Sequence, residues 1–228
     1  MTKPTYSRRG FLGATMAAPF IARGATREQF SIGLVADAQY ADVPDKGTRF
    51  YRASIGKLGA AVEHFNRTDL VFCAHLGDLI DREWRSFDEI MRPLAASRHR
   101  WHQVLGNHDF EVLEAEKPRV PGRLGMKGRH GAFDHDGFRF VVLDTNDLST
   151  YAHPVGAAER AAAERELTRL QAAKVRQAKP WNGGVSAPQL AWLERELAGA
   201  RSRGQRVIVF AHHPVWPDND HNVWNAPE

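Results

Sequence analysis

Four short segments of the chain combine carboxylate, carboxamide and imidazole side chains, and each follows an apolar run typical of a buried strand. They are Asp37-Ala38-Gln39, Gly77-Asp78, Gly106-Asn107-His108-Asp109 and His212-His213-Pro214. Open α/β sheets bind ligands at the carboxyl ends of their strands, so we expect the four segments to meet in one pocket. Groups of these types, gathered around a bridging carboxylate, can hold a pair of divalent metal ions.

The expected ligands to such a metal pair are two carboxylates, two carboxamides and one imidazole. Asp37 and Gln39 alternate along one extended segment, so both side chains can point the same way. Asp78 is the expected bridge, and the second ion takes an amide oxygen from Asn107 and a ring nitrogen from His212. Metal binding lowers the pKa of water, so a hydroxide held between two ions is a strong nucleophile near neutral pH and can attack phosphorus.

The residues expected to assist this attack adjoin the ligands. His108 is the candidate catalytic residue, because a protonated imidazole can stabilise phosphoryl oxygens or donate a proton to the leaving group. Asp109 is expected to orient the His108 ring. Three arginines are candidate phosphate clamps, although surface arginines often only face solvent: Arg49, Arg82 and Arg129.

The elements that must position these groups alternate between strand and helix, which predicts layered α/β architecture. Asp136-Gly137 is a type I′ hairpin signal between two apolar runs, so we expect the sheets to be mixed. Ser86 with Glu89, and Ser186 with Gln189, are capping-box signatures at the starts of two helices. The expected strands span 30–36, 70–74, 101–105, 132–135, 138–143 and 206–211, and the helices follow Thr48, Ser86, residue 156 and Ser186.

Two further expectations concern the parts between these elements. Leu190, Leu193 and Leu197 recur at helical spacing and predict the buried stripe of the last helix. Residues 111–130 are rich in Pro, Gly, Lys and Arg and predict a loop.

The composition is that of a soluble globular protein, with 43% hydrophobic and 25% charged residues in 228. This length allows one domain with a large core. The net charge of +4 arises from residues 1–25, which hold four basic residues and no acidic ones. We therefore infer no nucleic-acid binding. Cys73 is the only cysteine, so no internal disulfide is expected.

Residues 1–25 resemble a twin-arginine signal peptide, with Ser7-Arg8-Arg9-Gly10-Phe11-Leu12 as its core motif. The apolar stretch from Phe11 to Ala22 is shorter than the about 20 residues that span a bilayer. Small residues at 22–25 suit a signal peptidase. We expect a periplasmic or secreted protein, delivered by the twin-arginine export machinery and without a stable membrane anchor.

The motifs Asp-x-Gln, Gly-Asp-x-x-Asp, Gly-Asn-His-Asp and His-x-Pro resemble those of the calcineurin-like metallophosphoesterase superfamily. Gly47-Thr48-Arg49, residues 143–148 and residues 182–186 are most similar to the manganese-dependent ADP-ribose/CDP-alcohol diphosphatases. The resemblance spans Phe30 to Trp224. It implies a four-layer αββα sandwich with two mixed β-sheets, a dinuclear site with the ligands and the catalytic histidine named above, and a phosphoesterase domain over residues 26–228.

The sequence departs from this superfamily at two points. Most members have histidine where Gln39 stands, and an amide oxygen should shift the preference from zinc toward manganese or magnesium. The superfamily also completes its site with Gly-His-x-His, a motif that does not occur in this sequence. We therefore expect the domain to lack its C-terminal part, to bind metal weakly, to expose apolar sheet surface and to have little activity.

The leading hypothesis is a metal-dependent hydrolase of small phosphate esters or diphosphates such as ADP-ribose or CDP-alcohols. Its expected cofactors are two divalent ions, Mn²⁺ first, with Mg²⁺, Fe and Zn²⁺ as alternatives. A cyclic-nucleotide or phospholipid-headgroup phosphodiesterase and a phosphomonoesterase use the same chemistry and stay open. The alternative of another class is a truncated, non-catalytic remnant.

Overall fold

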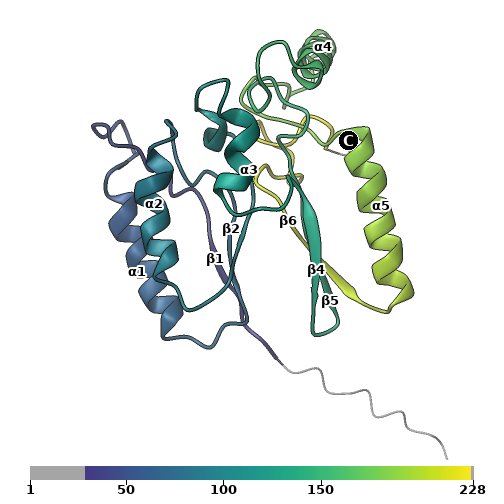
Figure 1. Cartoon of the computed structure of the whole chain (residues 1–228). Helices are drawn as coiled ribbons and strands as arrows, with labels where there is room; N and C mark the ends of the chain where they lie inside the picture. The colour runs from purple at the N-terminus through teal and green to yellow at the C-terminus, as the bar shows by residue number, and fades with distance from the viewer. Residues whose placement is uncertain (1–28, 227–228) are drawn as a thin grey trace, which may run out of the picture.

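Two three-stranded sheets face each other in the computed structural model, which describes residues 29–226 (Figure 1). The expected export signal in residues 1–25 lies outside this part of the chain. The first sheet has the order β1-β2-β3 and the second the order β4-β5-β6. The strands are β1 (Gly33–Val35), β2 (Cys73–His75), β3 (Trp101–Gln103), β4 (Gly131–His135), β5 (Phe138–Val142) and β6 (Arg206–Phe210).

The helices complete the expected four-layer αββα arrangement. Helices α1 (Ser54–Asn66) and α2 (Ser86–Ala95) cover the outer face of the first sheet, and α5 (Ala187–Ser202) runs along the outer face of the second. Helix α4 (Ala158–Ala172) lies beyond one end of the sandwich, the end at which the parallel strands β1, β2 and β3 finish.

The expectation of two mixed sheets is correct for the second sheet only. There β4 and β5 are antiparallel while β5 and β6 are parallel. The three described strands of the first sheet are all parallel. The reason is their connections, because α1 and α2 each carry the chain back across the sheet, as parallel pairing requires.

Aromatic side chains form the core between the two sheets. Phe72, the residue just before β2, lies edge-on to Phe140 of β5, with ring centroids 5.0 Å apart, and Phe210 of β6 packs on Phe140. Phe140 has no exposed surface. A second cluster, which includes Leu79, Ile80, Phe87 and Ile90, joins the first sheet to its helices.

Two of the local sequence predictions are confirmed, the hairpin turn at Asp136-Gly137 and the Ser186 cap of α5. Asp136 and Gly137 have φ values of 39° and 72°, as a type I′ turn requires. Ser186 is the N-cap of α5 and accepts a hydrogen bond from the backbone N–H of Gln189. The capping box at Ser86 is wrong: α2 starts at this buried residue, and Arg85 is the N-cap without a side-chain bond.

The buried stripe expected on α5 is also wrong, since Leu190 and Leu197 are 39% and 40% exposed. The helix is instead fixed by Gln189, whose amide accepts from the backbone N–H of Asp144 and donates to its C=O, both at 2.9 Å. This pair turns Gln189 inward, while Leu190 and Leu197 face outward and Leu193 is half-buried. Apolar surface is also exposed on the sheets, at Leu34 and Val209.

The segment 111–130 is not a simple loop. It contains the 3-10 turn η2 (Lys117–Arg119) and the short helix α3 (Val120–Arg123), and a further 3-10 turn, η1 (His108–Phe110), precedes it. Val120 is fully buried, so this basic stretch contributes to the core. Within residues 29–226, no helix is both long and apolar enough to cross a bilayer.

His75 at the end of β2 makes the fold sensitive to acid. Its side chain has no exposed surface, and neither ring nitrogen has a hydrogen-bond partner among the described residues. Burial, with a smaller contribution from His212, lowers the pKa of His75 from 6.5 to about 3. The unfolded chain therefore binds this proton first, and stability is lost as the pH falls from about 6.5 toward 3.

We predict that His75→Leu reduces the pH dependence of stability by about 1.4 kcal/mol per pH unit between pH 6 and pH 4. The measurement is urea unfolding at a series of pH values for both proteins. Near pH 8 the variant should be no less stable, because it removes a buried polar group without partners. Parallel curves for the two proteins would show that His75 does not titrate in this range.

Candidate active site

The site lies where the strands of both sheets end. Because β1, β2 and β3 are parallel, the loops that carry Asp37, Asp78 and Asn107 leave the sheet at the same edge. Backbone bonds join two of these loops, since Asp37 N–H donates to Gly77 C=O at 3.0 Å and Gln39 N–H to Asp78 C=O at 2.9 Å. His212 arrives from the second sheet, just after β6.

The backbone folds sharply at the ligand positions. Asp37, Gln39 and Asp78 have φ values of 55°, 45° and 58°, a left-handed conformation that is uncommon outside glycine. Gly77 has a φ of 97°, and a Cβ there would lie 2.5 Å from His212 Nδ1. A Cβ on Gly106 would lie 2.1 Å from the Asp78 backbone nitrogen. The two glycines therefore let the three loops and His212 approach one another.

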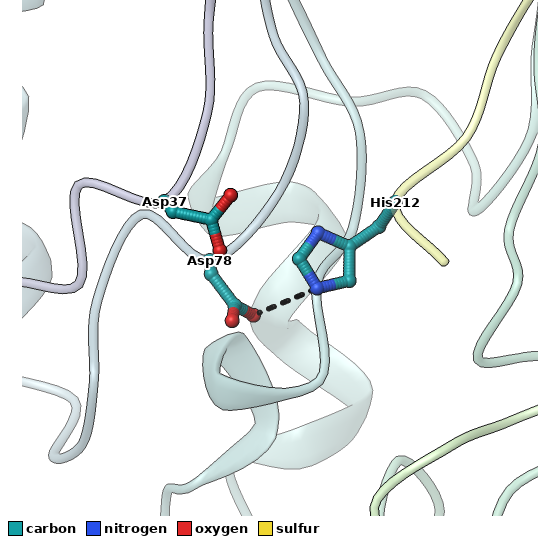
Figure 2. Close-up of side chains that lie close together, drawn as sticks. All are labelled: Asp37, Asp78 and His212. Atoms are coloured by element: carbon teal, nitrogen blue, oxygen red, sulfur yellow. Dashed lines mark ion pairs between the residues drawn. The ribbon is translucent and has the colours of Figure 1, made fainter. Parts of the chain in front are cut away.

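All five expected metal ligands converge. Figure 2 shows Asp37, Asp78 and His212 pointing toward one another, and one ligand atom of each lies within 4.8 Å of the others. Gln39 Nε2 donates to Asp78 Oδ2 at 3.1 Å. His212 Nε2 is 3.1 Å from Asn107 Oδ1 and 3.5 Å from Asp78 Oδ1.

The donor set suits divalent cations. Burial raises the pKa of Asp37, His212 opposes this effect and the Asp78 carboxylate adds to it, so the raised pKa reflects mainly the removal of the carboxylate from water. His212 Nδ1 lies 2.9 Å from Leu76 C=O, and donation there leaves Nε2 with a lone pair for a metal ion. Turning the Gln39 amide by 180° presents its oxygen to a cation at little steric cost.

His108 faces the same cluster. Its backbone N–H donates to Asp78 Oδ1 at 2.8 Å. Its ring Nδ1 lies 3.2 Å from the Asp81 C=O and 3.4 Å from Asp81 Oδ1, while Nε2 lies 3.4 Å from Arg49. Asp81 is therefore the residue that holds the His108 ring, through its backbone C=O and with its carboxylate close by.

The orienting role expected for Asp109 is wrong. Its carboxylate is fully buried and accepts backbone N–H groups of Gly106, Asp78, Leu79 and Ile80 at 2.9 to 3.3 Å. A carboxylate already committed to these four donors fixes the two loops rather than the ring of its neighbour. Burial, with the Asp78 charge, raises the pKa of Asp109 to about 7.

The three candidate arginines fall in different places. Arg49 lines a cavity of about 560 Å³ together with the expected ligands and His108. Arg82 binds Asp81 and lies over the Tyr51 ring, outside the lining of this cavity. Arg129 is not brought to the cavity either, because it pairs with the buried Asp144 and lies over Phe110.

Sequence reasoning assigned no role to several residues of this cavity: Asp81 beneath His108, and the lining residues Trp181, Asn182, His213, Pro214 and His221. His213 is buried, and burial lowers its pKa to about 3. Its Nδ1 lies 2.9 Å from Thr145 Oγ1. Motif spacing gives a signal for Asp81, as the last residue of Gly-Asp-x-x-Asp, whereas Trp181 lies next to the Asn182-Gly183-Gly184 motif.

Two facing sheets with carboxylate, carboxamide and imidazole donors at their strand ends define a metal-dependent phosphoesterase. The chain belongs to the calcineurin-like phosphoesterase family, whose sequence profile matches residues 30–228.

Curated relatives and a solved structure agree with this assignment. A manganese-dependent ADP-ribose/CDP-alcohol diphosphatase from Arabidopsis thaliana is 32% identical over 219 residues, which cover 82% of this chain and 69% of the relative. The protein of the same name from Danio rerio is 30% identical over 229 residues, covering 82% and 71%. A crystal structure of a dimetal phosphatase from Danio rerio matches with a TM-score of 0.75 at 28% identity, covering 86% of this chain and 74% of that one.

We predict that Asp81→Asn and Asp109→Asn have different effects. Asp81→Asn keeps the backbone bond to the His108 ring but removes the negative charge beside Nδ1, and it should lower kcat about 10–100-fold with little change in the unfolding midpoint. Asp109→Asn turns an amide N–H₂ toward buried N–H donors and should cost about 1–3 kcal/mol of stability. Steady-state kinetics with Mn²⁺ and urea unfolding on both variants are the measurements. A larger kcat loss in folded Asp109→Asn than in Asp81→Asn would restore Asp109 as the partner of His108.

Proposed function

We propose that this protein hydrolyses the diphosphate bond of nucleoside diphosphate-linked small molecules such as ADP-ribose and CDP-alcohols. The observation that carries the proposal is the convergence of the five donor residues with His108 in one cavity. The substrate class comes from relatives at 27–32% identity that are named ADP-ribose/CDP-alcohol diphosphatases.

Each side chain has a role in this reaction. Asp37, Gln39, Asp78, Asn107 and His212 would hold two divalent cations, which when bound neutralise phosphoryl oxygens and lower the pKa of water. Asp81 keeps His108 Nδ1 in place, so Nε2 is the ring atom directed toward the cavity. When protonated, Nε2 donates to a phosphoryl oxygen or to the leaving oxygen.

Manganese is the proposed metal. The relatives are named manganese-dependent, and the ligand set is rich in oxygen, with a single imidazole among five side chains. Assays of the metal dependence should extend from no added Mn²⁺ to an excess of Mn²⁺ over the protein.

We predict Mn²⁺-dependent release of AMP from ADP-ribose and of CMP from CDP-choline, followed by chromatography. Hydrolysis should be lost with EDTA and fall at least about 100-fold in Asp78→Ala, which removes the bridging carboxylate. Cyclic AMP and p-nitrophenyl phosphate serve as comparison substrates for the phosphodiesterase and phosphomonoesterase alternatives. Faster turnover with Zn²⁺ than with Mn²⁺ would contradict the metal assignment, and no metal-dependent turnover of any substrate would favour the non-catalytic remnant.

We also propose that the protein is exported through the twin-arginine route to the periplasm or the medium. Support comes from the sequence alone, in the paired Arg8 and Arg9 before a short apolar stretch that is free of acidic residues.

Replacing both residues, Arg8→Lys with Arg9→Lys, should leave the full chain in the cytoplasm of a bacterium that has the twin-arginine translocase. Cell fractionation and immunoblotting measure the distribution. The double variant keeps the charge of the segment, so a loss of export reports the arginine pair itself. Unchanged export of the variant would argue against this route.

A further inference from the structure

The loop after β5, residues 143–148, contributes no expected metal ligand, yet its centre is fully buried. Asp144, Thr145 and Asn146 have no exposed surface. Because β5 is parallel to β6, this β5 loop leaves the second sheet at the same end as His212. β5 is also the middle strand of its sheet, between β4 and β6. Side chains of the β5 loop can therefore contact the loops of both sheets.

Asn146 joins the β5 loop to the first sheet. Its Nδ2 donates to the C=O of Leu105 at 2.7 Å, and Leu105 directly precedes Gly106-Asn107. Its Oδ1 accepts a hydrogen bond from the Tyr151 hydroxyl at 2.7 Å. Both ends of the amide are engaged, and this fixes its orientation. The position of the backbone just before the candidate ligand Asn107 therefore depends on Asn146.

Thr145, the preceding residue, joins the β5 loop to the loop after β6. Its Oγ1 accepts the backbone N–H of His213 at 3.2 Å. The same oxygen lies 2.9 Å from His213 Nδ1, to which its hydroxyl can donate. His213 directly follows the candidate ligand His212. One hydroxyl therefore holds both the backbone and the ring of the residue next to His212.

The two side chains that these contacts anchor meet in the candidate site. Asn107 Oδ1 and His212 Nε2 lie 3.1 Å apart, although they follow strands of different sheets and are 105 positions apart in sequence. They are also the two side chains that we expect to share the second ion. Thr145 and Asn146 are neighbours joined by one planar peptide bond, so the two contacts are held at a fixed spacing.

A second loop packs against the β5 loop. Leu148 N–H donates to Gly184 C=O at 3.0 Å, and Gly184 N–H donates to Leu148 C=O at 2.8 Å. A Cβ on Gly183 would overlap the Thr145 C=O and would lie 3.2 Å from the Tyr151 hydroxyl oxygen. Glycine at position 183 therefore allows the close approach that keeps the β5 loop in place.

We propose that Thr145 and Asn146 are positioning residues, which set the separation of His212 and Asn107 and thereby the affinity for the ion that these two side chains would share. The proposal rests on the proposed function, because it concerns the metal pair of that site. Asp109 joins two loops of the first sheet, whereas Thr145 and Asn146 join the first sheet to the second. The loss of a partner that orients a ligand without touching the ion typically weakens metal binding by about 10–100-fold.

The test is calorimetric titration of the metal-free protein with Mn²⁺ in the absence of substrate. His212→Ala identifies the ion that uses this imidazole, because the Kd of that ion rises most. Thr145→Val removes the hydroxyl but keeps the shape of the side chain, and it should raise the Kd of the same ion about 10–100-fold. Thr145→Ser should stay within about threefold of the wild type, because its hydroxyl can still bind His213. Asn146→Ala releases Leu105 and should weaken the same ion as Thr145→Val.

Ser186→Ala is the matched control. Ser186 caps α5 and donates to Asp147 of the β5 loop, but among the described residues it makes no hydrogen bond to the loops that carry Asn107 and His212. The variant loses stability with its cap, while its Mn²⁺ affinities should stay those of the wild type. Urea unfolding of every variant shows that the titrated protein is folded. If Ser186→Ala weakened Mn²⁺ binding as much as Thr145→Val, the effect would be a general loss of stability and the proposal would be overturned.

The remaining results separate this proposal from the proposed function. Unchanged Mn²⁺ binding in Thr145→Val and Asn146→Ala, or equal weakening of both ions, would overturn the positioning role and leave the diphosphatase standing. If one of these two variants does not fold, the other decides. Mn²⁺ binding that depends on Thr145 without turnover of CDP-choline would refute the diphosphatase and keep the positioning role. A wild type that binds no Mn²⁺ would refute both.

Discussion

The geometry of the site depends on one buried carboxylate. Asp109 accepts the backbone N–H of Gly106 from its own loop and three successive N–H groups from the loop that carries Asp78. It thereby joins the two loops that present Asp78 and Asn107. The low dielectric of the interior strengthens such bonds and makes the loss of any partner costly. This connection fixes the spacing between Asp78 and Asn107, two of the candidate metal ligands.

The second constraint is that the candidate metal ligands come from both halves of the sandwich. Asp37, Asp78 and Asn107 follow strands of the first sheet, and His212 follows the last strand of the second. The aromatic core around Phe140 fixes the two sheets relative to each other. Side chains that never touch the site therefore set the distance between the His212 imidazole and the carboxylates.

Much of this arrangement could be predicted from sequence, because the ligand motifs lie at strand ends and turn chemistry is local. The Asp136-Gly137 hairpin and the Ser186 cap follow from residues within a few positions of each other. The expectations that proved wrong concern residues whose contacts are with segments distant in sequence. Asp109 is next to His108 in sequence, yet its oxygens bind the loop that carries Asp78.

The positions of Arg129 and of helix α5 also depend on contacts with residues distant in sequence. Arg129 is a cation in a basic stretch, and only the fold shows that the buried Asp144 is its partner. The leucines of α5 have core spacing, but the pairing of Gln189 with the Asp144 backbone sets the rotation of the helix.

The contact between His212 and Leu76 joins residues 136 positions apart, and it has a consequence for how the protein assembles. Strands β1 to β3 and their helices can form from local contacts, whereas the imidazole reaches the acidic loops only after the two sheets dock. Cations that need all these ligands bind only the docked state. An ion present at 100 times its Kd then stabilises the docked state by about 2.7 kcal/mol. The concentration of metal ions available while the protein folds would therefore determine how firmly the two sheets stay docked.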